Sequence, residues 1–180
     1  MQPSIKSDAS VPPVREDRKA EALRMARRIC EERGLRLTTL RQAALVAIAS
    51  SDRPLGAYHL SSLLDESLGK RVAPPTVYRA LDFLLQSGLI ARVESRNAYI
   101  LCEKPERAGR SVVFLCNRCD ASTKVADIGL EQLIEADAAT VGFQIDKPII
   151  ECSGTCRACA DKSATATSLE KPVPSTGNAS

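Results

Sequence analysis

Two Cys-x-x-Cys pairs constrain this chain more than any other feature of its sequence. Cys116 and Cys119 form the first pair, Cys156 and Cys159 form the second, and 36 residues separate the two pairs. Together they supply four thiolates, which is the closed tetrahedral ligand set that structural zinc uses. The long separation predicts a complete strand-helix-strand unit between the pairs. We therefore expect one structural zinc ion, held by a fold that brings both pairs together.

The alternative interpretation of the pairs is thiol-disulfide chemistry. A thioredoxin-like site needs one Cys-x-x-Cys pair at the start of a helix beside a strand, whereas this chain has two pairs. The only histidine, His59, is far in sequence from both. General acid-base catalysis by histidine and Cys-His nucleophilic catalysis both need a histidine close to the reacting groups. A zinc ion with four protein ligands has no open position at which to activate water. The sequence therefore argues against an enzyme, and a Cys-x-x-Cys thiol oxidoreductase is the least favoured alternative.

The cellular compartment follows from what the N-terminal segment lacks. No apolar run approaches the length of a membrane-spanning helix, and residues 1–17 contain no apolar stretch that resembles a secretory signal. We therefore expect a cytoplasmic protein without membrane association, in which the seven cysteines stay reduced. Residues 1–17 and 161–180 are polar and lack an apolar period, so the sequence predicts disordered tails at both ends.

The first half of the chain has the pattern of a winged helix. From residue 18 onward, apolar residues recur at helical spacing, and further helices are predicted over 39–51, 57–67 and 75–87. Two β-prone runs, 89–94 and 98–101, then predict a hairpin. A helix-turn-helix followed by a hairpin is a winged helix, which we assign to residues 18–102.

The second half has the pattern of a small α/β unit. A polar hinge is predicted over residues 103–110, followed by a strand at 111–116, a helix at 128–140 and a strand at 143–152. The unit ends after the second cysteine pair, so it covers residues 111–160. The predicted fold class is therefore α+β, with an N-terminal winged helix-turn-helix followed by a small α/β domain that carries the four-cysteine zinc site.

Charge and helix position point to double-stranded DNA as the partner. Residues 1–100 hold 16 basic and 11 acidic residues, a net charge of +5, whereas residues 101–180 hold 9 and 11, a net charge of −2. The second helix of a helix-turn-helix lies in the major groove, and here its early polar residues are Thr76, Tyr78 and Arg79. Arg79 is suited to paired hydrogen bonds with guanine. Phosphate contacts are expected from the basic residues Arg36, Arg41, Lys70, Arg71, Arg92 and Arg96. For any one of these residues, the alternative is a solvated helical face.

Several runs of residues resemble the Fur family of metal-responsive repressors. They are Leu37-Thr-Thr-Leu-Arg-Gln-Ala-Ala-Leu, Ala57-Tyr58-His59-Leu60, Pro75-Thr-Val-Tyr-Arg-Ala-Leu-Asp-Phe-Leu and the two cysteine pairs. Within that family, the wing segment from Arg92 to Cys102 and the Cys116-Asn-Arg-Cys119 pair resemble those of the zinc uptake regulators. The resemblance covers the chain from about Ala22 to Ala160.

This resemblance implies both an architecture and a function. It implies a winged-helix DNA-binding domain, a hinge, and a C-terminal dimerisation domain with a structural zinc. It also implies a transcriptional repressor of metal (zinc) homeostasis genes that binds a DNA operator as a homodimer. At the level of residues, it implies that Tyr58 and Arg79 occupy base-contacting positions.

The resemblance further implies a second, regulatory zinc site near the hinge, and here the sequence departs from the family. That site uses a wing histidine, the cysteine ending the wing, a hinge histidine and an acidic residue. Only the cysteine matches, as Cys102, whereas Ala91, Gly109 and Lys124 stand at the other positions. We therefore expect Cys102 to be a remnant of a regulatory site, and repression to be constitutive. The alternative is a thiol-redox-responsive regulator that senses oxidants through Cys102 and Cys152.

Overall fold

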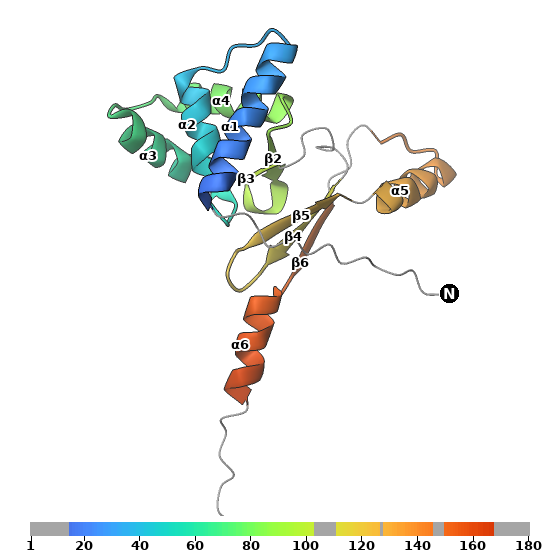
Figure 1. Ribbon diagram of the computed structural model, residues 1–180. Helices are drawn as coiled ribbons and strands as arrows, with labels where there is room; N and C mark the ends of the chain where they lie inside the picture. The colour runs from blue at the N-terminus through green and yellow to red at the C-terminus, as the bar shows by residue number, and fades with distance from the viewer. Residues whose placement is uncertain (1–14, 103–110, 127, 146–149, 168–180) are drawn as a thin grey trace, which may run out of the picture.

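The computed structural model describes residues 15–102, 111–126, 128–145 and 150–167 (Figure 1). The predicted hinge, residues 103–110, lies outside the described residues. In chain order the elements are α1 (Arg15–Glu32), α2 (Thr39–Ala49), β1 (Leu55–Gly56), α3 (Ala57–Leu68), α4 (Pro74–Gln86), β2 (Ile90–Val93), the short 3₁₀ turn η1 (Glu94–Arg96), β3 (Ala98–Leu101), β4 (Ser111–Cys116), β5 (Ser122–Ala126), α5 (Ile128–Thr140), β6 (Ile150–Gly154) and α6 (Arg157–Thr167). This order confirms the predicted class, a winged helix-turn-helix followed by a small α/β unit.

The helices of the first half surround one apolar core. Thr38 caps α2, because its side-chain oxygen accepts a hydrogen bond from the backbone N–H of Arg41 at 3.4 Å. Two prolines, Pro74 and Pro75, begin α4, where their missing N–H groups would have no helical partner. The fully buried core side chains include Leu45, Ile48, Leu60, Leu64, Leu81 and Leu84. Because the core takes one face of α4, the opposite face of this helix stays at the surface.

The wing follows α4 directly. Gly88 has a positive φ of 72°, which ends the helix and turns the chain into β2. Strand β3 lies at the centre of a three-stranded antiparallel sheet with the order β1-β3-β2. The β2–β3 hairpin predicted from the sequence is confirmed, and its connection is the short turn η1.

The second half contains a mixed three-stranded sheet with the order β5-β4-β6. Strand β4 is antiparallel to β5 and parallel to β6, and the parallel pair requires the long crossover that contains α5. Strand β5 was not expected from the sequence. The predicted placement of the last strand over residues 143–152 was wrong, because β6 spans Ile150–Gly154.

Both predicted tails overlap a helix of the structure. Helix α1 starts at Arg15, and α6 continues to Thr167, so parts of the predicted tails 1–17 and 161–180 are helical. Ion pairs within each helix contribute to this extension, between Lys19 and Glu16 in α1 and between Arg157 and Asp161 in α6. The rest of each tail lies outside the described residues. None of the helices described here has the length and hydrophobicity needed to cross a membrane.

The two halves of the chain are in contact through the wing. Val93 and Ile100 of the wing pack with Val113 and Leu115 of β4 in a buried apolar cluster. We call this contact the wing–sheet junction. Close to it, the backbone N–H of Ser122 at the start of β5 donates to the carbonyl of Asp52 at 3.3 Å. The C-terminal sheet therefore lies directly against the winged helix.

Candidate metal centre and nucleic-acid interface

Both cysteine pairs lie at the same end of the C-terminal sheet. Cys116 ends β4 and is paired with Gly154 at the end of β6, which places the next cysteines, at the start of α6, beside it. The ligand atoms of Cys116, Cys119, Cys156 and Cys159 all lie within 4.8 Å of one another. We call these residues the four-cysteine cluster. The parallel pairing of β4 and β6 therefore closes the 36-residue gap between the two pairs.

Backbone N–H groups stabilise negative charge in the four-cysteine cluster. Those of Arg118 and Cys156 donate to Cys116 Sγ, with N···S distances of 3.4 and 3.3 Å. Backbone hydrogen bonds, the strongest from Cys156, lower the pKa of Cys116 to about 6. Cys159 shifts the other way, because hydrogen bonds with neighbouring thiols and burial raise its pKa to about 12. Four thiols this close ionise together only when a cation offsets their charge.

This donor set fits a structural zinc ion. Tetrahedral zinc with Zn–S bonds of about 2.3 Å separates its sulfurs by about 3.8 Å, and Cys119 Sγ lies 3.7 Å from Cys156 Sγ. All four ligands would come from the protein, so no coordination position is left for water or substrate. The zinc would hold the ends of β4 and β6 and the start of α6 together, and it would have no catalytic role.

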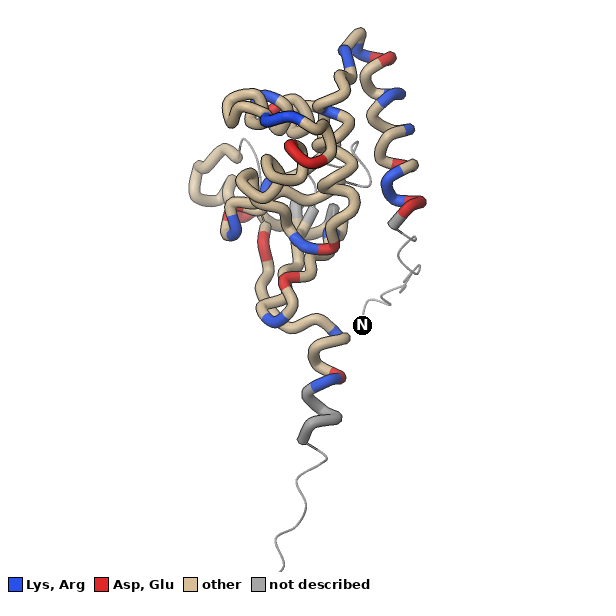
Figure 2. The backbone as a smooth tube through the Cα atoms, turned by 90° about the vertical axis from the view of Figure 1, so that its left-hand side faces the viewer, with Lys and Arg blue, Asp and Glu red and all other residues tan. Residues whose placement is uncertain are grey.

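Most of the predicted DNA-contacting residues are exposed on the winged helix. Thr76, Tyr78 and Arg79 are exposed on α4, while Val77 between them is buried. Lys70 and Arg71 are exposed in the loop before α4. Tyr58, near the start of α3, has 90% of its surface exposed. Figure 2 shows basic residues along the helices of this half.

Three arginines with predicted phosphate contacts have partners within the protein. The guanidinium of Arg41 stacks on the ring of Phe83 at 3.5 Å and also donates to a backbone carbonyl. Arg92 contacts Asn97 at 2.8 Å and Glu94 at 3.2 Å. Arg96 forms an ion pair with Asp120 of the C-terminal half. The wing tip is thus bound to the C-terminal sheet, a role that the sequence did not suggest for Arg96.

Cys102 lies at the wing–sheet junction and is only 2% exposed. Its backbone N–H donates to the carbonyl of Leu89 at 2.9 Å, and the ammonium nitrogen of Lys124 in β5 lies 3.0 Å from its sulfur. Within the described part of the chain, the four-cysteine cluster is the only group of cysteine, histidine or acidic residues close enough to hold a metal. Cys102 is therefore not joined to a ligand set there.

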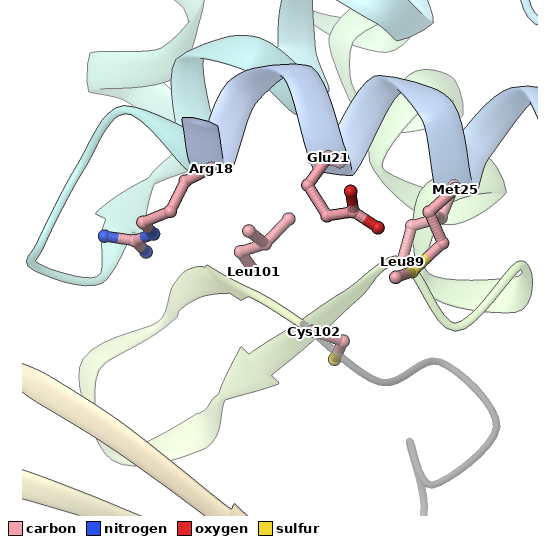
Figure 3. Close-up of a pocket in the computed structure, with 7 residues that line it drawn as sticks. Arg18, Glu21, Met25, Leu89, Leu101 and Cys102 are labelled. Atoms are coloured by element: carbon pink, nitrogen blue, oxygen red, sulfur yellow. The ribbon is translucent and has the colours of Figure 1, made fainter. Parts of the chain in front are cut away.

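Cys102 also borders a cavity of about 130 Å³ between α1 and the wing. Apolar side chains, among them Met25, Leu89 and Leu101, form much of its wall (Figure 3). The side chain of Cys102 points away from Glu21, the cavity's only carboxylate (Figure 3). The cavity therefore does not bring a carboxylate ligand to this sulfur.

Cys152 does not approach Cys102 from the C-terminal sheet. It is exposed and pairs with Phe114, whereas its neighbour Glu151 is on the face of the sheet that contacts the wing. Successive residues of a strand point to opposite faces, so Cys152 lies on the far face from Lys124 and Cys102. The burial of Cys102 and this separation both disfavour a redox-sensing pair.

The chain matches the model of the ferric uptake regulator family over residues 32–153. It is 40% identical over 144 residues to the zinc uptake regulation protein of Escherichia coli, an alignment that covers 78% of this chain and 82% of the relative. The zinc uptake regulation protein of Shigella flexneri matches with the same identity and coverage.

Two solved structures are similar to this chain over both halves. A zinc uptake regulator complexed with zinc and DNA gives a TM-score of 0.77 at 39% identity, covering 81% of this chain and 97% of that one. The holo form of XcZur gives a TM-score of 0.72 at 38% identity, covering 79% of this chain and 99% of the other. The similarity therefore includes the relative placement of the winged helix and the C-terminal sheet.

Proposed function

Since the chain belongs to the ferric uptake regulator family, we propose that it represses transcription of zinc-homeostasis genes by binding operator DNA as a homodimer. It holds one structural zinc per chain, acts in the cytoplasm where the DNA is, and catalyses no reaction. The observation that carries this proposal is the exposed polar face of α4 next to two exposed basic residues. Residues 18–102 bind DNA, and residues 111–160 form the dimer.

The geometry of α4 supports its role as the reading helix. Val77, Leu81 and Leu84 are fully buried in the core, which fixes the rotation of the helix about its axis. Thr76 and Arg79 are consequently directed outward in the first turns, the part of a recognition helix that reaches base edges. Arg79 contacts bases, while Lys70 and Arg71 contact phosphates and set the salt dependence of binding.

Exposed apolar residues in the second half support the homodimer. Phe114 and Val125, on the face of the sheet opposite the wing, are 47% and 46% exposed. Leu133, Val141 and Phe143, in and after α5, are 64%, 78% and 66% exposed. In Figure 1, α5 projects beyond the end of the sheet instead of covering a face. Exposed large apolar side chains of this kind are typical of a protein interface, and a second copy of the chain offers the matching surface.

The test of this function separates base reading from phosphate binding. Arg79→Ala should weaken binding to a palindromic AT-rich duplex by about 1–3 kcal/mol and relax the preference at one base position. Lys70→Ala should weaken binding to all sequences and reduce the slope of log affinity against log salt by about one. Fluorescence anisotropy over a salt series measures both effects.

Arg53→Ala is the matched control. Arg53 is exposed, and it lies in the loop next to Asp52, whose carbonyl accepts a hydrogen bond from the C-terminal sheet. The substitution should change neither affinity nor base preference. If Arg79→Ala behaved like this control, α4 would not be the reading helix and the proposed function would lose its main support.

A further inference from the structure

One row of residues crosses the C-terminal sheet and faces the wing. Lys124 of β5 pairs with Val113 of β4, and Val113 pairs in turn with Glu151 of β6. Directly paired residues point to the same face of a sheet. Val113 packs against Val93 and Ile100 of the wing, so this is the face that forms the wing–sheet junction.

Each end of this row forms a polar contact with the wing. At one end, the carboxylate of Glu151 accepts hydrogen bonds from the backbone N–H groups of Glu94 and Ser95, at 2.6 and 3.2 Å. At the other end, the ammonium of Lys124 donates to the sulfur of Cys102 at 3.0 Å. The row therefore holds the wing through an anion, an apolar side chain and a cation.

Among the residues that the structure describes, those around Cys102 do not fit a second zinc ion. A tight zinc site needs three or four N, S or O ligands around one point. A protonated lysine has no lone pair to offer, and its positive charge repels a metal cation from the same sulfur. The chain's one imidazole, that of His59, is exposed on α3 beside Tyr58. A contact partner of this sulfur is thus a cation that belongs to the protein.

We propose that Lys124 serves as a built-in cation that holds the wing against the C-terminal sheet, at the position where the family resemblance implies a regulatory zinc. This inference rests on the proposed function, because its consequence is that operator binding needs the structural zinc but no second one.

The test compares the full-length, zinc-loaded chain with Lys124→Met, which keeps the length of the side chain and removes its charge. A palindromic AT-rich duplex is titrated at low and high buffered free zinc, and zinc per chain is measured by mass spectrometry. The wild type should hold about one zinc and change its affinity less than threefold between the two zinc levels. Lys124→Met should bind at least about tenfold more weakly at both levels, a loss of about 1.4 kcal/mol.

Two further variants separate charge from a general loss of structure. Lys124→Arg keeps the cation and should stay within about threefold of the wild type, since an arginine also donates to sulfur. Lys162→Met removes an exposed lysine of α6 and should have no effect. Wild-type affinity in Lys124→Met would overturn the inference, as would a gain of more than about tenfold when the wild type takes up a second zinc.

A readout without DNA keeps this test independent of the proposed function. The amide of Cys102 donates to Leu89, so its hydrogen exchange reports how firmly the wing is held. Lys124→Met should accelerate exchange over residues 98–102, and Lys124→Arg should restore the wild-type rate. If the wild type bound the palindromic duplex no more tightly than other duplexes, the proposed function would fail. The exchange rates would still decide the role of Lys124. Unchanged exchange in Lys124→Met would overturn that role.

Discussion

At the four-cysteine cluster, each sulfur lies within 4.8 Å of three others, whereas at the wing–sheet junction the sulfur of Cys102 lies 3.0 Å from an ammonium nitrogen. Both places join segments that are distant along the chain. In the four-cysteine cluster, four thiolates need a bound metal cation to offset their charge. At the wing–sheet junction, strand β5 already supplies a cation, the ammonium of Lys124. The comparison shows that the neighbours of a cysteine, more than the cysteine itself, decide whether it becomes a metal ligand.

The two places also hold different parts of the molecule. The four-cysteine cluster joins β4, β6 and α6, all within the C-terminal half. The wing–sheet junction joins the two halves to each other. Disrupting the cluster should therefore unfold part of the chain, whereas disrupting the junction should mainly release the wing from the sheet. This difference sets the order of the expected effects.

The largest effect is expected from Cys119→Ser, which removes one ligand from the cluster. A structural zinc contributes binding free energy on the order of 10 kcal/mol to folding, so the C-terminal half should unfold and the dimer should dissociate. Elemental analysis measures the loss of zinc, circular dichroism the loss of folded structure, and gel filtration the loss of the dimer. Cys152→Ser is the control, since Cys152 is exposed and outside the cluster. A dimeric Cys119→Ser protein with normal secondary structure would show that the cluster does not carry the fold.

A gain of function at the junction should come next in size. Ala91→His combined with Lys124→Glu would remove the ammonium and place an imidazole and a carboxylate near Cys102, because Ala91 packs into the same apolar cluster as Val113. Zinc content should rise from about one to about two per chain, and operator binding should weaken at least about tenfold on chelation. Unchanged zinc content in this variant would mean that the missing ligands alone do not explain the difference between the two places.

The smallest effect is expected from Glu151→Gln at the other end of the row. Burial raises the pKa of Glu151, but hydrogen bonds from the side chain of Ser95 and the backbone of Glu94 and Ser95 outweigh this effect, so the pKa lies below its ordinary value. A depressed carboxyl pKa stabilises the fold above the ordinary pKa, and this contribution is lost as pH falls through the folded-state value. The variant should lose about 0.5–1.5 kcal/mol at pH 7.

Denaturant unfolding at several pH values checks this expectation. The difference in unfolding free energy between wild type and Glu151→Gln should stay constant from about pH 7 to pH 5 and shrink at lower pH. A difference that grew on acidification would contradict the hydrogen bonds assigned to this carboxylate.

The sequence predicts the helices of the first half closely, because local signals define them. Thr38 caps α2, a proline pair starts α4, and the apolar residues recur at helical spacing. The zinc cluster was predictable for a similar reason, since four cysteines in two pairs leave few other uses. Strand β5 was missed because its short run, Ser-Thr-Lys-Val-Ala, has one apolar residue larger than alanine and lies at an edge of the sheet.

The junction was beyond sequence reasoning for a different reason. Lys124 stood out only as a departure from the family pattern, and Glu151 carried no signal at all. Their roles depend on the pairing of β5 and β6 with β4, which places both residues on one face of the sheet. Pairing register depends on contacts between distant segments, so no local pattern near either residue reveals which part of the wing it meets.

The exposed side chains of α5 and its neighbouring residues make the assembly sensitive to how much of the protein a cell contains. Leu133, Val141 and Phe143 are exposed in a single chain, and in the proposed homodimer a second chain would cover them. The stabilisation gained from such an association grows with the logarithm of concentration. Dilution during growth would therefore favour single chains, which carry one reading helix each and bind one half of a palindromic site. Protein abundance would then act as a signal in its own right, even where free zinc leaves operator affinity unchanged.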